Sequence, residues 1–187
     1  MKHVSRMWGD LNLSLLPPAL HLRPATITDL PFLRALYRTV RDPELALTPW
    51  TEAQKQAFSD SQFALQDHHY RKHYPTASFM VVEHLGTAVG RLYLAAPTGQ
   101  LRLMDIALLP PWRRRGWGAA LVRMVLECAD RQGRETLLYV EVSNPAYGLY
   151  QREGFITGEL EGVYVCMRRP PAPTAKRALP VARVDGG

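Results

Sequence analysis

The chain has 187 residues, of which 47% are hydrophobic and 21% charged, a composition typical of one soluble globular domain. Its formal net charge of +6 favours acidic partners such as phosphate groups. Half of that charge lies in the two ends, so the middle carries too little to indicate a nucleic-acid-binding protein. Two cysteines without a CxxC pair indicate a reducing compartment, and no apolar run is long enough to span a bilayer. Because polar residues and Pro17-Pro18 interrupt the first apolar stretch, it is a poor signal-peptide core, and we expect a cytoplasmic protein.

The two ends differ in composition from the rest of the chain. Residues 1–18 are predicted to be a loosely held extension, and residues 170–187, rich in Pro and Ala, a flexible basic tail. The predicted domain is therefore 19–169, a normal size for a single domain.

The first half of that domain reads as one strand and two helices. A strand is expected over 19–25, and the helix after it has Thr28 as a candidate cap. Thr51 and Gln54 form a capping box, which predicts a second helix from Glu52 to about Tyr74, before Pro75. The apolar face of the first helix is formed by Leu33, Leu36, Tyr37 and Val40.

The second half alternates strands and helices. A hairpin over 78–95 should turn at Leu85-Gly86. It is followed by a strand at 101–110, a helix ending near Gly133, a strand at 136–142, a short helix at 146–152 and two strands over 155–169. The order βααβββαβαββ predicts an α/β (α+β) fold, with a mixed, mostly antiparallel sheet around one central parallel βαβ unit.

The loop Arg113–Gly118, with the sequence RRRGWG, lies between the strand and the helix of that unit. Gly116 and Gly118 allow a ligand to approach the backbone, and the helix start offers unpaired N–H groups and a positive dipole. The loop is therefore predicted to bind an anion, although a solvated basic turn has the same composition. It is neither a dinucleotide fingerprint nor a P-loop, since the required third glycine and the Gly-Lys-Ser/Thr are missing.

Two motifs together resemble the GNAT superfamily of N-acetyltransferases. The first runs from Leu108 through the arginines to Gly118, and the second, NPAYGLYQREGF, covers 144–155. The resemblance extends over about 19–169 and implies acetyl-CoA as cosubstrate. It also implies that Ala107 and Leu108 hold the pantetheine arm through their backbone, where their strand and the strand at 136–142 splay apart. The pyrophosphate would meet the backbone amides of Arg113, Arg114, Arg115, Gly116, Trp117, Gly118 and Ala119.

The resemblance also implies catalytic residues. Tyr150 would be the general acid, since a free tyrosine with a pKa near 10 stays protonated at neutral pH. Asn144 would orient the cofactor, or is only a turn residue before Pro145. We expect Glu141 to be the general base, then Asp105 and then Glu83, two carboxylates placed among apolar strand residues. A chain of water molecules without a single base is a further alternative.

The segment QDHHYRKHY at 66–74 falls in the region that varies with substrate in this family. Phe63, Tyr70 and Tyr74 are predicted to line the acceptor pocket, together with Glu83 and Asp105. His69 and His73 are spaced to share a metal, but no third ligand follows at a recognisable spacing, so no metal is predicted.

The sequence leaves three functions open. The first is an acetyl-CoA-dependent N-acetyltransferase, monomeric or homodimeric, that acts on a primary amine of a small molecule or peptide. The second is a CoA-binding protein of the same fold without catalysis, which the presence of Tyr150 disfavours. The third is a nucleic-acid-binding protein, which would need a broad basic face with interleaved aromatics, whereas Trp112 and Trp117 form one local cluster. We therefore expect no nucleic acid and no membrane among its partners.

Overall fold

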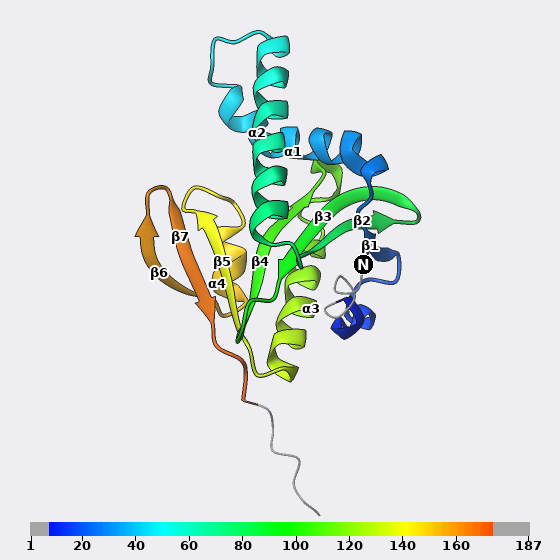
Figure 1. The fold of residues 1–187 in the computed structure, drawn as a ribbon, viewed down its shortest axis with the longest axis vertical. Coiled ribbons are helices and arrows are strands. Elements are labelled where there is room, and N and C mark those ends of the chain that lie inside the picture. The colour runs from blue at the N-terminus through cyan, green and yellow to red at the C-terminus, as the bar shows by residue number, and fades with distance from the viewer. Residues whose placement is uncertain (1–7, 174–187) are drawn as a thin grey trace, which may run out of the picture.

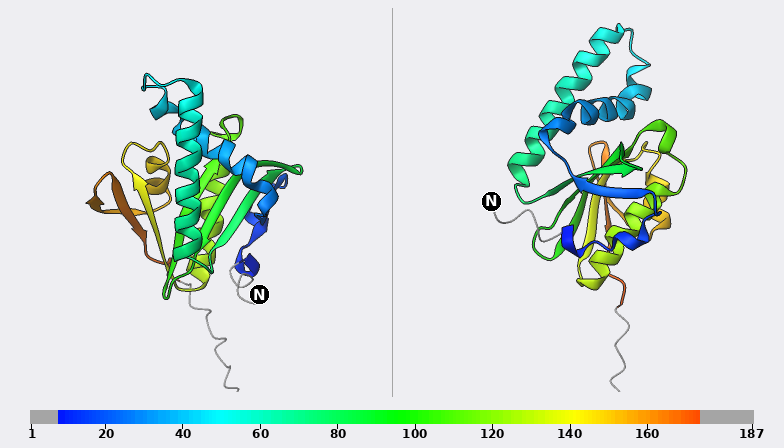
Figure 2. Two further views of the ribbon diagram at one scale, coloured as in Figure 1. Left: turned by 45° about the horizontal axis from the view of Figure 1, so that its top comes forward. Right: turned by 90° about the vertical axis from the view of Figure 1, so that its right-hand side faces the viewer.

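The computed structural model describes residues 8–173, in which one seven-stranded sheet carries helices on both faces (Figures 1 and 2). In chain order the elements are η1 (Trp8–Asp10), η2 (Leu13–Leu15), β1 (Leu20–Pro24), η3 (Ile27–Asp29), α1 (Leu30–Leu45), α2 (Glu52–His73), β2 (Ser78–His84), β3 (Thr87–Ala95), β4 (Gln100–Leu108), η4 (Pro110–Trp112), α3 (Trp117–Arg131), β5 (Glu135–Glu141), α4 (Tyr147–Arg152), β6 (Ile156–Glu161) and β7 (Tyr164–Arg169).

The strands follow the order β1-β2-β3-β4-β5-β7-β6. All neighbouring pairs are antiparallel except β4 and β5, which are parallel and joined by α3. The predicted mixed sheet with one central βαβ unit is therefore confirmed. The β2–β3 hairpin turns at Leu85 and Gly86, whose φ angles of 49° and 80° match the twist of a tight hairpin.

The start of α2 was predicted correctly from a local sequence pattern, whereas the cap of α1 was not. The predicted capping box of α2 is present, because Thr51 N donates to Gln54 Oε1 at 2.8 Å and Gln54 N donates to Thr51 Oγ1 at 3.3 Å. The predicted cap of α1 at Thr28 is wrong, because a 3₁₀ turn precedes that helix. There the Asp29 carboxylate accepts from both Thr26 N and Thr26 Oγ1.

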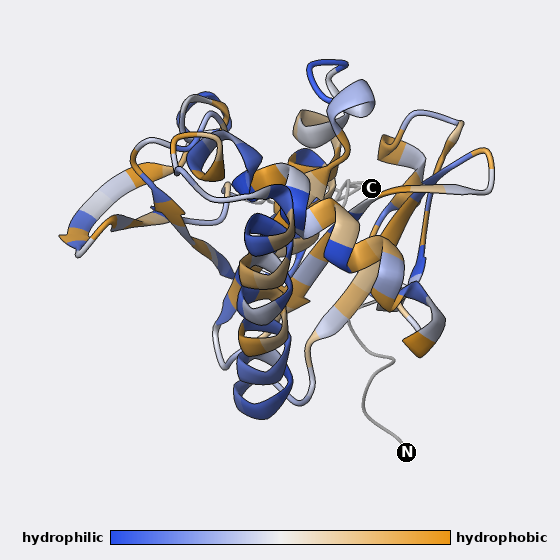
Figure 3. Cartoon of the chain, turned by 90° about the horizontal axis from the view of Figure 1, so that it is seen from above, coloured by the Kyte–Doolittle hydropathy of each residue, from blue (hydrophilic) through white to orange (hydrophobic). Residues whose placement is uncertain are grey.

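The core lies mainly between α3 and the sheet. Seven of the fifteen residues of α3 are buried, whereas in the 22 residues of α2 only Ser59 and Phe63 are. Hydrophilic residues accordingly predominate along α2 in Figure 3. On α1, Leu33, Leu36 and Tyr37 are buried as predicted, but Val40 is exposed, so the buried face of α1 is narrower than predicted.

The described part of the N-terminal segment is not a loosely held extension. Leu11 and Leu16 are buried in the main core, and Gln132 at the end of α3 donates to the Asp10 carboxylate. At the other end, Ala172 N donates to Asp130 Oδ1 at 2.7 Å, so the chain still follows α3 beyond β7. Residues 174–187 of the expected tail lie outside the described residues, and the domain boundary at 169 stays a prediction.

Candidate active site

The two central strands separate toward their C-terminal ends. β4 and β5 pair only at Gln100–Glu135, Leu101–Thr136 and Arg102–Leu137. Beyond these pairs β4 still pairs with β3, and β5 still pairs with β7, but β4 and β5 no longer pair with each other. Figure 1 shows the two strands diverging. The residues predicted to hold the pantetheine arm, Ala107 and Leu108, lie on the β4 side of this opening. Backbone groups that face it need another partner, which a ligand can supply.

The loop after β4 presents a helix N-terminus to solvent. β4 ends at Leu108, two residues earlier than predicted, because Pro110 begins a 3₁₀ turn. Gly116 caps α3 in the left-handed conformation with φ 80°, and Arg114 is also left-handed with φ 58°. A non-glycine residue in that region costs roughly 1–3 kcal/mol, and such strain is concentrated at ligand sites. No atom lies within 4 Å of a Cβ built on Gly116, so the space beside the loop is open.

The three arginines of the loop have different surroundings. Arg113 is tied back into the fold, since its Nε donates to Leu108 O at 2.7 Å and its Nη2 to Thr39 Oγ1 at 2.9 Å. Burial lowers the pKa of its guanidinium. Arg115 lies over the rings of Trp112 and Trp117, with its Cζ 5.0 Å and 6.0 Å from their centroids. Of the three side chains, Arg114 and Arg115 are left to face an anion.

Trp112 and Trp117 stack on each other at 5.0 Å, and His84 from β2 packs against both rings at 4.5 Å and 5.1 Å. His84 could not be predicted as their partner, because it precedes β3 whereas the two tryptophans follow β4. The two tryptophans and His84 thus form one aromatic cluster beside the loop. Because the tryptophan rings stack on each other, they do not form the broad basic face with interleaved aromatics that nucleic-acid binding would need.

Tyr150 lies on α4, the helix that follows β5, and belongs to the main core. Its side chain is 5% exposed and meets the Phe155 ring edge-on at 5.7 Å. Burial, and to a lesser degree Asp105, raises the pKa of its hydroxyl above the ordinary value. Within residues 8–173 this hydroxyl has no hydrogen-bond partner, whereas the hydroxyl of nearby Tyr147 lies 2.7 Å from Thr157 Oγ1. Tyr150 is therefore protonated and free to donate.

Asn144 closes the turn between β5 and α4. Its Oδ1 accepts from Ala146 N at 2.8 Å, and its own N–H donates to Glu141 O at 2.9 Å. These bonds match the turn role that the sequence also allowed. A role toward the cofactor stays a prediction.

The carboxylates that were considered as bases lie in three different environments. Glu141, at the end of β5, lies 3.6 Å from Arg41 Nη1 of α1. Asp105 on β4 accepts two bonds from Arg91 of β3, at 2.9 Å and 2.7 Å. Glu83 on β2 is paired with Arg23 of β1 at 2.7 Å and is separated from the opening by β3 and β4. The fold therefore brings Asp105 close enough to Tyr150 to influence its hydroxyl, places Glu141 against α1, and leaves Glu83 apart.

Sequence reasoning missed Arg91, which is 2% exposed. Burial is the largest single influence on the Arg91 pKa and lowers it, but Asp105 together with Tyr93 and Tyr70 makes the net shift of the Arg91 pKa upward. Its Nη2 also donates to Gln66 Oε1 of α2 at 3.0 Å. Arg91 thereby joins β3, β4 and α2 below the acceptor side. A lone arginine in the segment GRLYLA is the only signal that could have suggested this role.

The predicted acceptor residues on α2 have separate positions. Tyr70 donates to Met104 O of β4 at 3.3 Å, at the opening, and Tyr74 accepts from Arg102 Nη1 at 2.6 Å. Phe63 is instead a core residue packed with Leu33 and Tyr37. His69 and His73 stack at 4.5 Å, and no set of three metal ligands occurs among the described residues.

Comparison with known proteins agrees with this geometry. The model of the acetyltransferase (GNAT) family matches residues 43–155, more than half of the chain. The chain therefore belongs to the acetyltransferase (GNAT) family. No helix within residues 8–173 has the length and apolar character needed to cross a membrane.

A Bacillus subtilis protein that carries the provisional name of a ribosomal protein bS18-alanine N-acetyltransferase is 32% identical over 92 residues. That match covers 48% of this chain and 61% of the relative, so the chain spans less than two thirds of the relative's length. Among solved structures, PaiA N-acetyltransferase of Thermoplasma acidophilum in complex with coenzyme A has a TM-score of 0.63 at 19% identity, covering 81% of this chain and 98% of that one. The ribosomal-protein-S18-alanine N-acetyltransferase of Escherichia coli has a TM-score of 0.56 at 17% identity, covering 86% and 99%. At these identities the two structures show a shared fold.

Proposed function

We propose that this protein is an acetyl-CoA-dependent N-acetyltransferase whose acceptor is the primary amine of a peptide N-terminus or small molecule. The observation that carries the proposal is the opening between β4 and β5, with a strained, glycine-containing helix start after β4 and the buried Tyr150 hydroxyl within the influence of Asp105 on β4. The proposed compartment is the cytoplasm, in keeping with two free cysteine thiols, Cys128 and Cys166.

The residues present fit acetyl-CoA. The N–H groups of Trp117, Gly118 and Ala119 precede the first intrahelical bond of α3, which Ala120 N makes to Gly116 O, so they can receive a pyrophosphate. Arg114 and Arg115 add positive charge beside these groups. Acetyl-CoA supplies an acetyl group activated as a thioester.

Two proton transfers are assigned to the chain. As the amine nitrogen bonds to the acetyl carbon and the carbon–sulfur bond breaks, Tyr150 donates its proton to the departing thiolate and regains one from solvent. Glu141, directly or through water, accepts the proton that the amine loses. A positioned general acid contributes about 10²–10⁴-fold to such a step. Asp105 is the less suitable base, because both of its oxygens already accept from Arg91.

The charges on the acceptor side favour a peptide N-terminus over a polyamine. Glu141 and Asp105, the two carboxylates at the opening, are each paired with an arginine, so little free negative charge remains there to attract a polycation. Tyr70 and Tyr164 stand beside them, and burial, followed by Glu141, raises the pKa of Tyr164. Tyrosine hydroxyls can bond to the peptide groups that follow an N-terminal amine. The name of the Bacillus subtilis relative, which specifies an alanine N-terminus, points to the same class.

The test is a thiol-release assay with acetyl-CoA and a panel of acceptors at equal concentration. The panel contains short peptides with free alanine, serine, glycine or methionine N-termini, the same peptides with blocked N-termini, and the polyamines spermidine and spermine. Turnover of free but not blocked peptides, at a higher kcat/KM than the polyamines, is expected. Turnover of polyamines alone would correct the acceptor class, and no acceptor-dependent release across a broad amine library would contradict catalysis.

A further inference from the structure

A bulge in β4 turns Arg102 and Asp105 to the same face of the sheet. The register between β3 and β4 shifts between Tyr93 and Leu94, which makes Met104 of β4 an extra residue. Because side chains alternate along a regular strand, two residues three apart would otherwise lie on opposite faces. Arg102 and Asp105 instead both lie on the face that α2 covers, which is the proposed acceptor side (Figure 1).

Two tyrosine rings hold the guanidinium of Arg102. Its Cζ lies 5.2 Å from the centroid of the Tyr74 ring of α2 and 4.8 Å from that of the Tyr139 ring of β5. Its Nη1 also donates to the Tyr74 hydroxyl at 2.6 Å. A guanidinium has five N–H donors, and those of Arg102 have no other hydrogen-bond partner among residues 8–173. Tyr139 is 36% exposed, so a ligand can reach this position from solvent.

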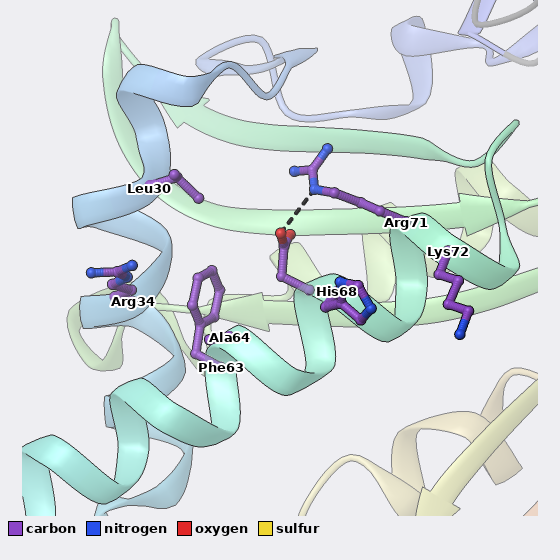
Figure 4. Close-up of a pocket in the computed structure, with 8 residues that line it drawn as sticks. Leu30, Arg34, Phe63, Ala64, His68, Arg71 and Lys72 are labelled. Atoms are coloured by element: carbon purple, nitrogen blue, oxygen red, sulfur yellow. Dashed lines mark hydrogen bonds and ion pairs between the residues drawn. The ribbon is translucent and has the colours of Figure 1, made fainter.

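Other arginines around this face and on α2 are each paired with a carboxylate. The pairs are Arg41–Glu141, Arg91–Asp105 and Arg168–Glu135 at the sheet, and Arg71–Asp67 on α2, which Figure 4 shows. Arg102, by contrast, makes no ion pair in the part of the chain that the structure describes. A fixed guanidinium with free donors and no counter-charge favours a carboxylate as its ligand.

The Tyr70 hydroxyl links Arg102 to the proposed place of the reaction. It donates to Met104 O at 3.3 Å, within the segment between Arg102 and Asp105. Its pKa is raised by burial and then by Asp105, which also acts on the Tyr150 hydroxyl, and is lowered by charges that include Arg102. Residues three apart in a strand are about 10 Å apart, and an extended peptide covers about 3.3 Å per residue. An acceptor amine near Asp105 therefore brings the second or third side chain of its peptide within reach of Arg102.

We propose that Arg102 selects acceptor peptides that carry aspartate or glutamate as their second or third residue. The acidic side chain receives the free N–H groups of the guanidinium, which Tyr74 and Tyr139 hold in place. Arg102 acts on specificity and takes no part in the chemical step. This inference rests on the proposed acetyl transfer and narrows its acceptor class.

The experiment measures thiol release from acetyl-CoA with amidated hexapeptides that begin with alanine. The second or the third residue is glutamate, glutamine or arginine, and the other residues are uncharged. At one of the two positions the glutamate peptide should have a kcat/KM about tenfold above that of its glutamine counterpart, mainly through a lower KM. The arginine peptide should fall below both, because it brings a second cation to Arg102.

Three variants show whether the preference comes from Arg102. Arg102→Gln should reduce the ratio of glutamate to glutamine peptide to near one, and Arg102→Lys, which keeps the charge, should retain part of it. Arg168→Gln is the matched control, since it removes an arginine that is already paired with Glu135 and should keep the full ratio. Stabilisation by acetyl-CoA reports that each variant is folded.

The possible failures are distinguishable. Turnover of all hexapeptides at one kcat/KM, or an equal loss of preference in Arg168→Gln, would overturn this inference and leave the proposed acetyl transfer intact. No turnover of any peptide would contradict the proposed function and this inference with it. The dipeptide alanyl-alanine and its amide are compared as well. A preference for the free dipeptide, without one among the hexapeptides, would assign Arg102 to the carboxylate of a small acceptor and overturn the peptide class.

Discussion

The two faces of the sheet are held together in different ways. On one face, α3 buries seven of its fifteen residues, and its N-terminal loop is shaped by glycine and by local hydrogen bonds. On the other face, α2 buries two residues out of 22 and is fixed to the sheet largely by polar contacts such as Gln66–Arg91 and Tyr70–Met104. The proposed cofactor side is thus a rigid, locally encoded structure. The acceptor side depends on contacts between distant residues, which allows it to vary without loss of the fold.

The largest effect is expected at Tyr150, where the two sides meet. Tyr150→Phe keeps the buried ring and its contact with Phe155 but removes the hydroxyl. Single-turnover acetyl transfer should slow by about 10²–10⁴-fold, with little change in thermal stability. Single-turnover rates are the appropriate measure, because product release can limit steady-state turnover.

Tyr147→Phe serves as the control for that variant. It removes a hydroxyl from the same helix, but one that contacts Thr157 at 2.7 Å and is exposed. Most activity should remain. Full single-turnover activity in Tyr150→Phe would mean that its hydroxyl is not the acid.

On the cofactor side, Gly118→Val should abolish acetyl-CoA binding without unfolding the protein. A Cβ at this position meets only Leu149 Cδ2, at 3.7 Å, so the fold can accept it, while the branched methyl groups would stand where the pyrophosphate binds. Acetyl-CoA at a hundred times its Kd should stabilise the unchanged protein by about 2.7 kcal/mol, and the variant should lose this gain. Gly118→Ala, which adds only the Cβ, should retain more of it. Equal stabilisation of all three proteins in a thermal-shift series would place the anion elsewhere.

On the acceptor side, Asp105→Asn should lower stability. It leaves the guanidinium of Arg91 buried without its counter-charge, and breaking a buried pair costs about 3–5 kcal/mol. Asp60→Asn is the control, since its pair with Arg38 is about one third exposed on both sides and should contribute about 1 kcal/mol or less. The free energies of unfolding of the two variants are measured by urea denaturation. Similar losses in both would mean that the Arg91–Asp105 pair stabilises the fold no more than an exposed ion pair does.

The same contrast explains what the sequence could predict. The hairpin at Leu85-Gly86, the capping box at Thr51 and the βαβ unit depend on residues close together in the chain, and each occurs as expected. The burial of Leu11 and Leu16 was missed, because short apolar residues among prolines have no periodicity that would mark them as core.

The side-chain partners at the site could not be predicted for a related reason. Arg91 meets Asp105 only because β3 and β4 pair in one register, with Tyr93 opposite Asp105 and Arg91 opposite Ala107. The backbone amide of Arg113 was expected to meet the pyrophosphate, yet it donates to Pro110 O at 3.2 Å, and the Arg113 guanidinium reaches Thr39, 74 positions earlier. Glu83 lies among apolar residues in the sequence, but in the structure it forms an ion pair with Arg23 of β1. Each case depends on tertiary register rather than on local pattern.

The smallest effect expected is that of alkaline pH on the acid step. Burial raises the pKa of Tyr150 above its ordinary value near 10, so the protonated, donating form persists to a higher pH than in a free tyrosine. Single-turnover rates with saturating acceptor should therefore show no decline between pH 8 and about pH 10. A decline in that range that is absent from Tyr150→Phe would mean that the hydroxyl ionises early and that its surroundings are more polar than described.

The central claim is that acetyl-CoA lies in the β4–β5 opening with its pyrophosphate on the start of α3. Titration of the ¹⁵N-labelled protein with acetyl-CoA tests it most directly. The largest amide shifts are expected at Ala107, Leu108 and Arg114–Ala119, with smaller ones around Tyr150. Saturable binding whose shifts leave Arg114–Ala119 unchanged would contradict it.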